Sequence, residues 1–157
     1  MTKKIQLTKT RSKWGELKLP IGKYIGEIID GKSGAYGQIY YFNGDRYEGE
    51  LKNAHPQGYG EMQYKNGDVY CGHFDDGIRH GSGVKTYRGI DGYVGEFHRG
   101  KEHGFGIYEQ FKNGNFHPYI VKYSKGTRKH MTPIAPSHPS ARKALASIHE
   151  LDAEMDI

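Results

Sequence analysis

The chain has 157 residues and a formal net charge of +5, a length that suits one ordinary domain. Only 35% of the residues are hydrophobic, whereas 23 are glycine and 13 are tyrosine, which argues against a thick apolar core. The aromatic content of 13% is too high for a disordered chain. Because tyrosine can be half buried and keep its hydroxyl at the surface, we expect a thin β-structure.

Neither a secretory signal nor a transmembrane segment is visible in the sequence. The first 15 residues lack the apolar core of a signal peptide. No apolar run approaches the ~20 residues that span a bilayer. The single cysteine, Cys71, cannot form an internal disulfide, and this is typical of a reducing compartment. We therefore expect a cytoplasmic protein.

Residues 1–13 form a basic arm without any acidic residue. Such an arm attracts anionic lipid by ~1 kcal/mol per basic residue near the surface. Acidic protein tails are an alternative partner, and a solvated terminus is the simplest reading. Nucleic acid is least favoured, because no aromatic and basic recognition motif accompanies the charge. Trp14, at the end of the arm, is expected to cover the first edge of the structure that follows. The candidate lipid-binding residues are Lys3, Lys4, Lys9, Arg11 and Lys13.

Residues 14–130 repeat one short pattern with a period of 23 residues. Glycines follow the first residue of each copy by two and thirteen positions, and an apolar residue follows it by four. A half-repeat opens the array, and a degenerate copy that starts at Tyr119 closes it, with Val121 in place of a glycine. The four full copies begin at Tyr24, Tyr47, Tyr70 and Tyr93.

Each copy is predicted to form a β-hairpin. "YEGEL" alternates with period two, so Tyr47, Gly49 and Leu51 share one face of a strand. Asn-Gly pairs, in "FNGD" at Phe42 and "KNGD" at Lys65, lie in the linkers to the second and third copies, and this dipeptide is the strongest short hairpin signal. A lone hairpin is barely stable in water, so the copies must stack. We expect an elongated, single-layer antiparallel ribbon in which the glycines leave space for tyrosine and phenylalanine rings.

The pattern Y-x-G-x-(F/L/I)-x-x-G followed by (H)-G-x-G resembles the MORN repeat, from Gly15 to about His130. Ala54, Ser33 and Gln57 depart from the pattern and weaken individual units only. The resemblance implies a mainly β fold, a twisted sheet with a groove. It also implies scaffolding in cytoskeletal or ciliary assemblies, binding of a partner helix in the groove, or membrane association.

Two sets of polar residues recur in the repeats. His80 and His103 occupy the same slot of successive copies, ~9–10 Å apart at two strand spacings. Zinc ligands must converge within ~2.1 Å of one ion, so we expect neither a metal nor a cofactor, and read both as loop histidines bonded to backbone. Glu27, Glu50 and Glu96 lie three residues after the repeat tyrosine, with His73 in the same slot of the third copy, and form a solvated face or a recognition strip for a basic partner. No catalytic residues and no small-molecule substrate are expected.

Aromatic residues of the array are candidates for contacts with a partner protein, because such residues dominate interfaces. The alternative is that their rings pack on the glycines within the sheet. The candidates are Tyr47, Tyr70, Phe74, Tyr93 and Phe97.

The C-terminal region changes in composition. Residues 131–136 form a proline-rich linker, and residues 137–157 are predicted to form an amphipathic helix. The helix either folds back onto the array or docks in a partner protein. Its apolar stripe includes Leu145, Ile148, Leu151 and Met155.

Two functional hypotheses follow. The first is a non-catalytic scaffold or adaptor, part of a larger complex, that binds a helix or filament of a partner protein through the groove of the array. The second is a peripheral membrane tether that binds anionic lipids through the basic arm. An accessory module of an enzyme is a third and weaker alternative.

Overall fold

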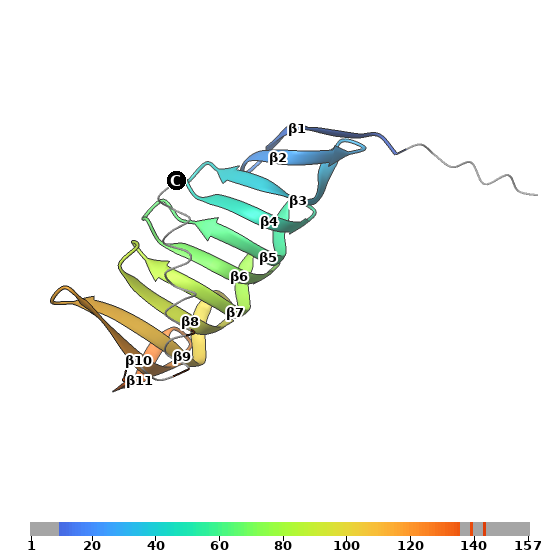
Figure 1. Cartoon of the computed structure of the whole chain (residues 1–157). Helices are drawn as coiled ribbons and strands as arrows, with labels where there is room; N and C mark the ends of the chain where they lie inside the picture. The colour runs from blue at the N-terminus through green and yellow to red at the C-terminus, as the bar shows by residue number, and fades with distance from the viewer. Residues whose placement is uncertain (1–9, 136–138, 140–142, 144–157) are drawn as a thin grey trace, which may run out of the picture.

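A computed structural model describes residues 10–135, 139 and 143 of the chain. Among these residues, eleven strands form one sheet, and each strand pairs antiparallel with its neighbours in sequence. This confirms the predicted elongated, single-layer ribbon of stacked hairpins (Figure 1). The strands are β1 (Ser12–Leu19), β2 (Gly22–Ile29), β3 (Lys32–Tyr41), β4 (Arg46–Lys52), β5 (His55–Gln63), β6 (Val69–Asp75), β7 (Ile78–Tyr87), β8 (Asp91–His98), β9 (Lys101–Lys112), β10 (Asn115–Ser124) and β11 (Thr127–Pro133).

The ends of the chain fall largely outside the described residues. The predicted helix over residues 137–157, with its apolar stripe, lies there apart from Pro139 and Lys143 and stays a prediction. Met131–Pro133, which we expected in the linker, form the end of β11. Within the described part of the chain, no helix is long and apolar enough to cross a bilayer.

The turn inside each hairpin explains one irregularity of the sequence. Seven residues after the repeat tyrosine, the chain needs a left-handed backbone, and Gly77 has φ +79° there. The second copy has Ala54 at this position with φ 60°, directly after Asn53 with φ 51°. A side chain with a Cβ is disfavoured in this region by roughly 1–2 kcal/mol. The copy with Ala54 keeps the turn but forms it at higher energy.

A row of glycines crosses the sheet and makes room for the repeat tyrosines. The strand registers place glycine opposite glycine from β1 to β9, and Val121 takes the place in β10. A Cβ built at Gly60 would lie 2.3 Å from the Oη of Tyr47, and one at Gly37 would lie 2.5 Å from Cε2 of Tyr24. Each ring therefore occupies the volume that a side chain would fill. The row is Gly15, Gly26, Gly37, Gly49, Gly60, Gly72, Gly83, Gly95 and Gly106.

The tyrosine hydroxyls are bonded to backbone at a register shift in each hairpin. In the second copy the register shifts between Gly49 and Leu51, and the Tyr47 hydroxyl donates to the Glu50 carbonyl at 2.7 Å. The Tyr24 hydroxyl likewise donates to the Glu27 carbonyl at 2.8 Å. A bulge leaves one residue without its backbone partner in the neighbouring strand. The tyrosine hydroxyl therefore donates to the carbonyl of the residue that the bulge leaves unpaired.

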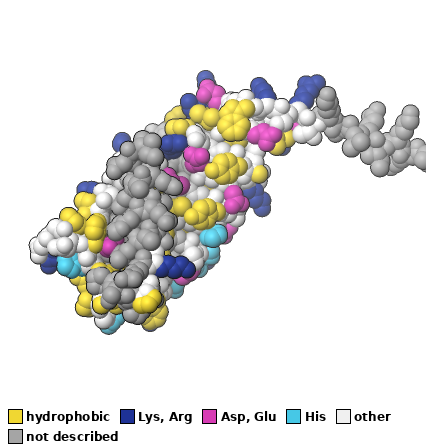
Figure 2. All heavy atoms as spheres, viewed as in Figure 1, with side chains coloured by type: hydrophobic (Ala, Val, Ile, Leu, Met, Phe, Trp, Pro, Cys, Tyr) yellow, Lys and Arg dark blue, Asp and Glu magenta, His cyan; other side chains and the backbone are white. Residues whose placement is uncertain are grey.

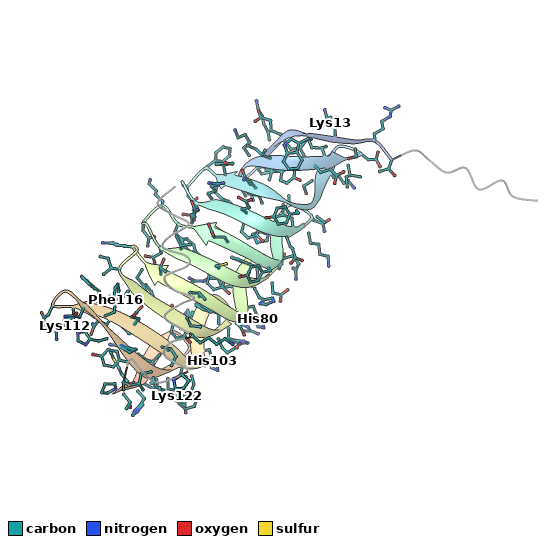
Figure 3. All side chains as sticks on the ribbon, viewed as in Figure 1. Lys13, His80, His103, Lys112, Phe116 and Lys122 are labelled. Atoms are coloured by element: carbon teal, nitrogen blue, oxygen red, sulfur yellow. The ribbon has the colours of Figure 1, made fainter. Side chains whose placement is uncertain are left out.

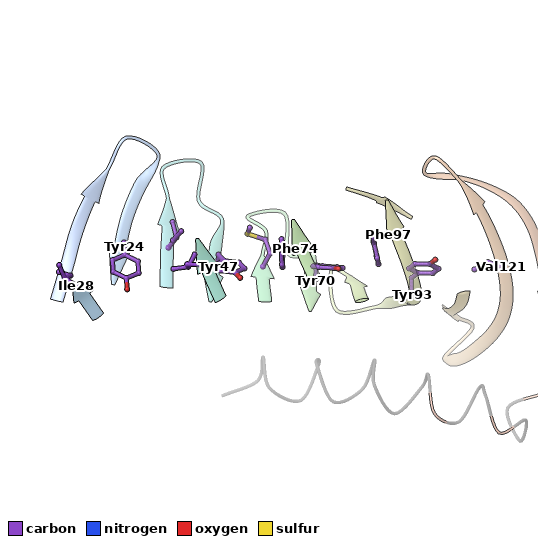
Figure 4. Packing of buried hydrophobic residues seen from close by; sticks show 11 residues of the cluster. Tyr24, Ile28, Tyr47, Tyr70, Phe74, Tyr93, Phe97 and Val121 are labelled. Atoms are coloured by element: carbon purple, nitrogen blue, oxygen red, sulfur yellow. The ribbon is translucent and has the colours of Figure 1, made fainter. Parts of the chain in front are cut away.

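Buried rings link the second repeat to the third and the third to the fourth (Figure 4). Phe74 contacts its own repeat's Tyr70 at a centroid distance of 5.1 Å and the preceding repeat's Tyr47 at 5.2 Å, both edge to face. Phe97 does the same with Tyr93 and Tyr70, at 5.5 and 4.8 Å. Edge-to-face pairs are favourable arrangements for aromatic rings. The core is thus a chain of nearest-neighbour contacts, as expected for a repeat array.

Alkaline pH is expected to unfold the array. Burial, helped by the Asp45 charge, raises the pKa of Tyr41 from 10.0 to about 12, and burial also raises the pKa of Tyr47 and Tyr70. Above pH 10 the unfolded chain releases tyrosine protons that the folded chain retains. This stabilisation is therefore complete below pH 10 and is lost as the pH rises toward and through the folded-state values.

The prediction is checked by following tyrosinate absorbance and β-sheet circular dichroism through an alkaline titration. We expect ionisation of the buried tyrosines to be delayed above pH 10 and to coincide with loss of the sheet signal. Ionisation of all tyrosines near their ordinary pKa of 10.0, with the sheet intact, would contradict it.

Candidate protein-interaction face

The two faces of the sheet carry different side chains. Strand alternation places Tyr24, Tyr47, Tyr70 and Tyr93 on one face, here called the inner face, where all four are buried. The opposite face is called the outer face. It carries the residue that immediately precedes each glycine of the row, because successive side chains of a strand point to opposite sides.

The aromatic residues that we expected to contact a partner are core residues. Each of them is at most 3% exposed, because their rings lie over the glycine row and against one another. The alternative interpretation, packing within the sheet, therefore holds for Tyr47, Tyr70, Phe74, Tyr93 and Phe97, and the expectation of a contact surface at these residues is not supported.

Glu27, Glu50 and Glu96 are exposed on the outer face, each at the register shift of its hairpin. Their carboxylates accept hydrogen bonds from the Ser12 hydroxyl, from the Tyr59 amide at 3.1 Å and from the Ser82 hydroxyl at 2.6 Å, respectively. None of the ion pairs among the described residues includes any of the three. These bonds orient the carboxylates without neutralising them.

Sequence reasoning missed the exposed aromatic residues of the outer face. Trp14, Tyr36, Tyr59 and Phe105 are 74%, 56%, 52% and 64% exposed, and each precedes a glycine of the row. The signal was present, since Tyr36, Tyr59 and Phe105 keep the 23-residue frame, with Ser82 in the third copy. We expected Trp14 to cover the first edge of the sheet. Its side chain is instead exposed on β1.

The rings and the carboxylates form one line across the strands. Trp14 on β1 pairs with Glu27 on β2, and Tyr36 on β3 pairs with Glu50 on β4. Figure 2 shows hydrophobic side chains at intervals along one side of the array, with acidic and histidine side chains between them. We call this line the outer ladder. It comprises Trp14, Glu27, Tyr36, Glu50, Tyr59, His73, Ser82, Glu96 and Phe105.

Two open depressions flank Tyr59 on the outer face. One, of about 440 Å³, is lined by Tyr36 and Tyr59 and by the carboxylates of Glu48 and Glu61. The other, of about 400 Å³, extends from Tyr59 to Glu96. Glu48 is bonded to Gln38 at 2.9 Å and paired with Arg46 at 3.3 Å. The first depression is therefore lined by the two aromatic rings and by two acidic side chains, Glu48 and Glu61, that are not members of the outer ladder.

His80 and His103, the two histidines that share a slot in successive repeats, pack in a row with His98. His80 and His103 lie in strands β7 and β9, not in loops, and both pack against His98 at ring centroid distances of 5.4 and 5.8 Å (Figure 3). No group of three or more His, Cys, Asp or Glu residues within the described residues is arranged to hold a metal ion. Cys71 is a strand residue of β6, and its Sγ lies 3.1 Å from the Tyr59 hydroxyl.

Part of the basic arm is visible at the N-terminal end of the sheet. Lys13 is exposed on β1 (Figure 3). Arg11 is exposed as well, and its amide donates to the Asp30 carboxylate at 3.1 Å. Both residues line an open depression at this end together with Ile28. Lys3, Lys4 and Lys9 lie outside the described residues, so their placement as lipid-binding candidates stays a prediction.

The fold and the exposed line of rings define a hairpin-repeat protein with a surface suited to interaction. Residues 24–46, 47–69, 70–89 and 93–109 match the model of the MORN repeat, which is more than half of the chain. The chain belongs to the MORN-repeat family. MORN repeats are generally non-catalytic modules that mediate protein or membrane interactions. A search of curated proteins found no match to the chain.

Proposed function

We propose that the chain is a non-catalytic scaffold or adaptor that binds a partner protein through the outer ladder, within a larger cytoskeletal or ciliary assembly. The observation that carries the proposal is the line of exposed rings alternating with carboxylates that no cation of the described residues neutralises. Exposed apolar groups in a rimmed, contiguous arrangement mark interaction sites. Aromatic residues are the side chains that most often dominate binding energy.

The ladder is also rigid before a partner arrives. The glycine row and the buried tyrosines fix the strand register, and the Glu50 and Glu96 side chains are held by hydrogen bonds. A preorganised surface loses little conformational entropy on binding. Its acidic groups favour a basic partner and disfavour nucleic acid, whose phosphates would be repelled.

The proposal places the contact on the outer face and not in the groove that we expected. The repeat tyrosines and phenylalanines of the inner face are buried within the array, and the further tyrosines that pack against them, such as Tyr41 and Tyr64, are half-buried. The rings of Trp14, Tyr36, Tyr59 and Phe105 remain more than half exposed. The outer face therefore supplies the aromatic contact area that the scaffold hypothesis requires.

A peripheral membrane tether is the second candidate function. It is favoured by the exposure of Arg11 and Lys13 at one end of the array, next to three further lysines in the sequence. Binding to vesicles that contain anionic lipid, without binding to neutral vesicles, would support it. Equal binding to both kinds of vesicle, or to neither, would count against it.

The scaffold proposal predicts that neutralising the ladder removes partners without affecting the fold. The test variant combines Glu27→Gln, Glu50→Gln and Glu96→Gln, which keep the hydrogen-bond acceptors. Proximity labelling and cross-linking in the native cell should show loss of cross-links to the outer face, with an unchanged melting temperature. The matched control combines Asp30→Asn, Asp75→Asn and Asp76→Asn, three exposed acids near hairpin turns. Partners retained by the ladder variant, or lost equally in the control, would contradict the proposal.

A further inference from the structure

The spacing of the outer ladder indicates which conformation of a partner fits it. We infer that the partner segment is a basic, proline-rich chain in polyproline II conformation, which lies across strands β1–β5 along the ladder from Trp14 to Tyr59. This inference rests on the proposed function and adds the chemistry of the bound segment.

The distance between successive rings sets the repeat length of the bound segment. Trp14, Tyr36 and Tyr59 lie on β1, β3 and β5, so each ring is two strands from the next. At a strand spacing near 4.8 Å, the rings follow one another at ~9.6 Å. A polyproline II helix advances ~3.1 Å per residue with three residues per turn, so equivalent residues recur every ~9.3 Å on one side. Across the two intervals from Trp14 to Tyr59, the mismatch is well below the width of a ring.

Other backbone conformations fit the same line less well. In an extended strand, residues three apart point to opposite sides, so they cannot meet successive rings. In an α-helix, the residues that share a face at this distance are seven apart and ~10.5 Å from each other. With strand spacings of about 4.8 Å, the third residue of a helix face would therefore lie about 2 Å beyond the third ring.

The side chains of the ladder match the same segment chemically. Aromatic-lined grooves bind proline-rich chains in this conformation in several recognition modules. Glu27 and Glu50 lie on β2 and β4, between the strands that carry the rings. A lysine or arginine between two ring-facing prolines is rotated by about 120° from them, and its long, flexible side chain can bend back to reach a carboxylate. Arginine can in addition stack on the faces of the rings.

The ladder also limits where the segment binds. In the third copy His73 replaces the glutamate and Ser82 replaces the ring, so the alternation is broken after β5. Two ring-to-ring intervals remain, from Trp14 to Tyr59, which correspond to about seven residues of polyproline II chain. Phe105 and Glu96 lie beyond the break and are not part of this binding site.

The test is the affinity of the full chain for a labelled peptide of four Pro-Pro-Arg triplets, measured by fluorescence anisotropy. We expect saturable binding that weakens at least tenfold in a variant with Tyr36→Ala and Tyr59→Ala. Glu27→Gln with Glu50→Gln should weaken binding and reduce its dependence on salt. The matched control is Phe42→Ala, since Phe42 is 79% exposed in the turn after β3 and off the ladder, and its affinity should not change.

Three results would overturn the inference. Equal affinity for a Gly-Ser-Arg peptide of the same length and charge would show that conformation does not matter. Equal or tighter binding of a basic helical peptide would assign the ladder to a helix. Binding that the ladder variants leave unchanged would place the site elsewhere. If the Pro-Pro-Arg peptide does not bind although the glutamine variant loses its cellular partners, the inference fails and the proposed function stands.

Discussion

Replacing Gly60 with alanine should lower the free energy of unfolding by about 2–3 kcal/mol, within the range that overpacking of a filled core produces. The added Cβ would lie 2.3–2.6 Å from Oη, Cζ and Cε2 of Tyr47, which is closer than real Cβ contacts come. The Tyr47 ring is fully buried and bonded to the Glu50 carbonyl, so it cannot move aside freely. Gly60 has no left-handed φ, so steric overlap accounts for the effect.

Gly15→Ala is the matched control for this prediction. Gly15 lies in the same row, on β1, but the nearest atom to its Cβ would be Cδ1 of Ile28 at 3.3 Å, at the end of a flexible side chain. We expect a change below about 1 kcal/mol, as for surface sites away from packed features. Chemical denaturation followed by circular dichroism measures both variants. Equal destabilisation at Gly15 and Gly60 would show that the tyrosine ring does not determine the requirement for glycine.

Truncating Tyr47 to alanine should destabilise the array by about 3–5 kcal/mol, the range for loss of a large buried ring. The ring covers Gly49 and Gly60 and makes an edge contact with Phe74 of the next repeat at 5.2 Å. Its loss therefore opens a cavity and uncouples two repeats. Tyr47→Phe keeps the ring and removes only the hydrogen bond to the Glu50 carbonyl, so a loss near 1 kcal/mol is expected.

The comparison for this prediction is an exposed tyrosine of the outer ladder. Tyr36→Ala removes a ring of the same size that is more than half exposed, and we expect a change of roughly 0.5 kcal/mol or less. The two faces of one strand pair should thus differ several-fold in their sensitivity to the same substitution. Similar losses at Tyr36 and Tyr47 in urea denaturation would contradict the assignment of the inner face as the core.

The fold could be predicted because its determinants repeat in the sequence. The 23-residue spacing of Tyr24, Tyr47 and the later copies predicted the hairpins, and the recurring glycines predicted the packing of rings on backbone. Alternation within "YEGEL" also placed Leu51 with Tyr47 and Glu50 on the other side. Both the spacing and the alternation can be read from the sequence without knowing how the strands pair.

The interaction face could not be predicted in the same way. Alternation tells which residues share a face, but in a single-layer sheet both faces border solvent. The burial of Tyr47 depends on Gly60 in the next strand and on Phe74 of the next repeat, which only the register brings together. The registers of β3 with β4 and of β4 with β5 then place Glu50 opposite Tyr36 and next to Tyr59. Exposure of the ladder is thus a result of pairing between strands.

The most direct test of this account is a double-mutant cycle between Tyr47 and Gly60. Tyr47→Leu removes Oη, Cζ and Cε2, the three atoms that a Cβ at Gly60 would meet, and keeps an apolar side chain. We predict that Gly60→Ala, which costs about 2–3 kcal/mol in the native chain, costs less than about 0.5 kcal/mol in the Tyr47→Leu chain. The same loss in both chains would contradict the claim that the glycine row exists to accommodate the tyrosine rings.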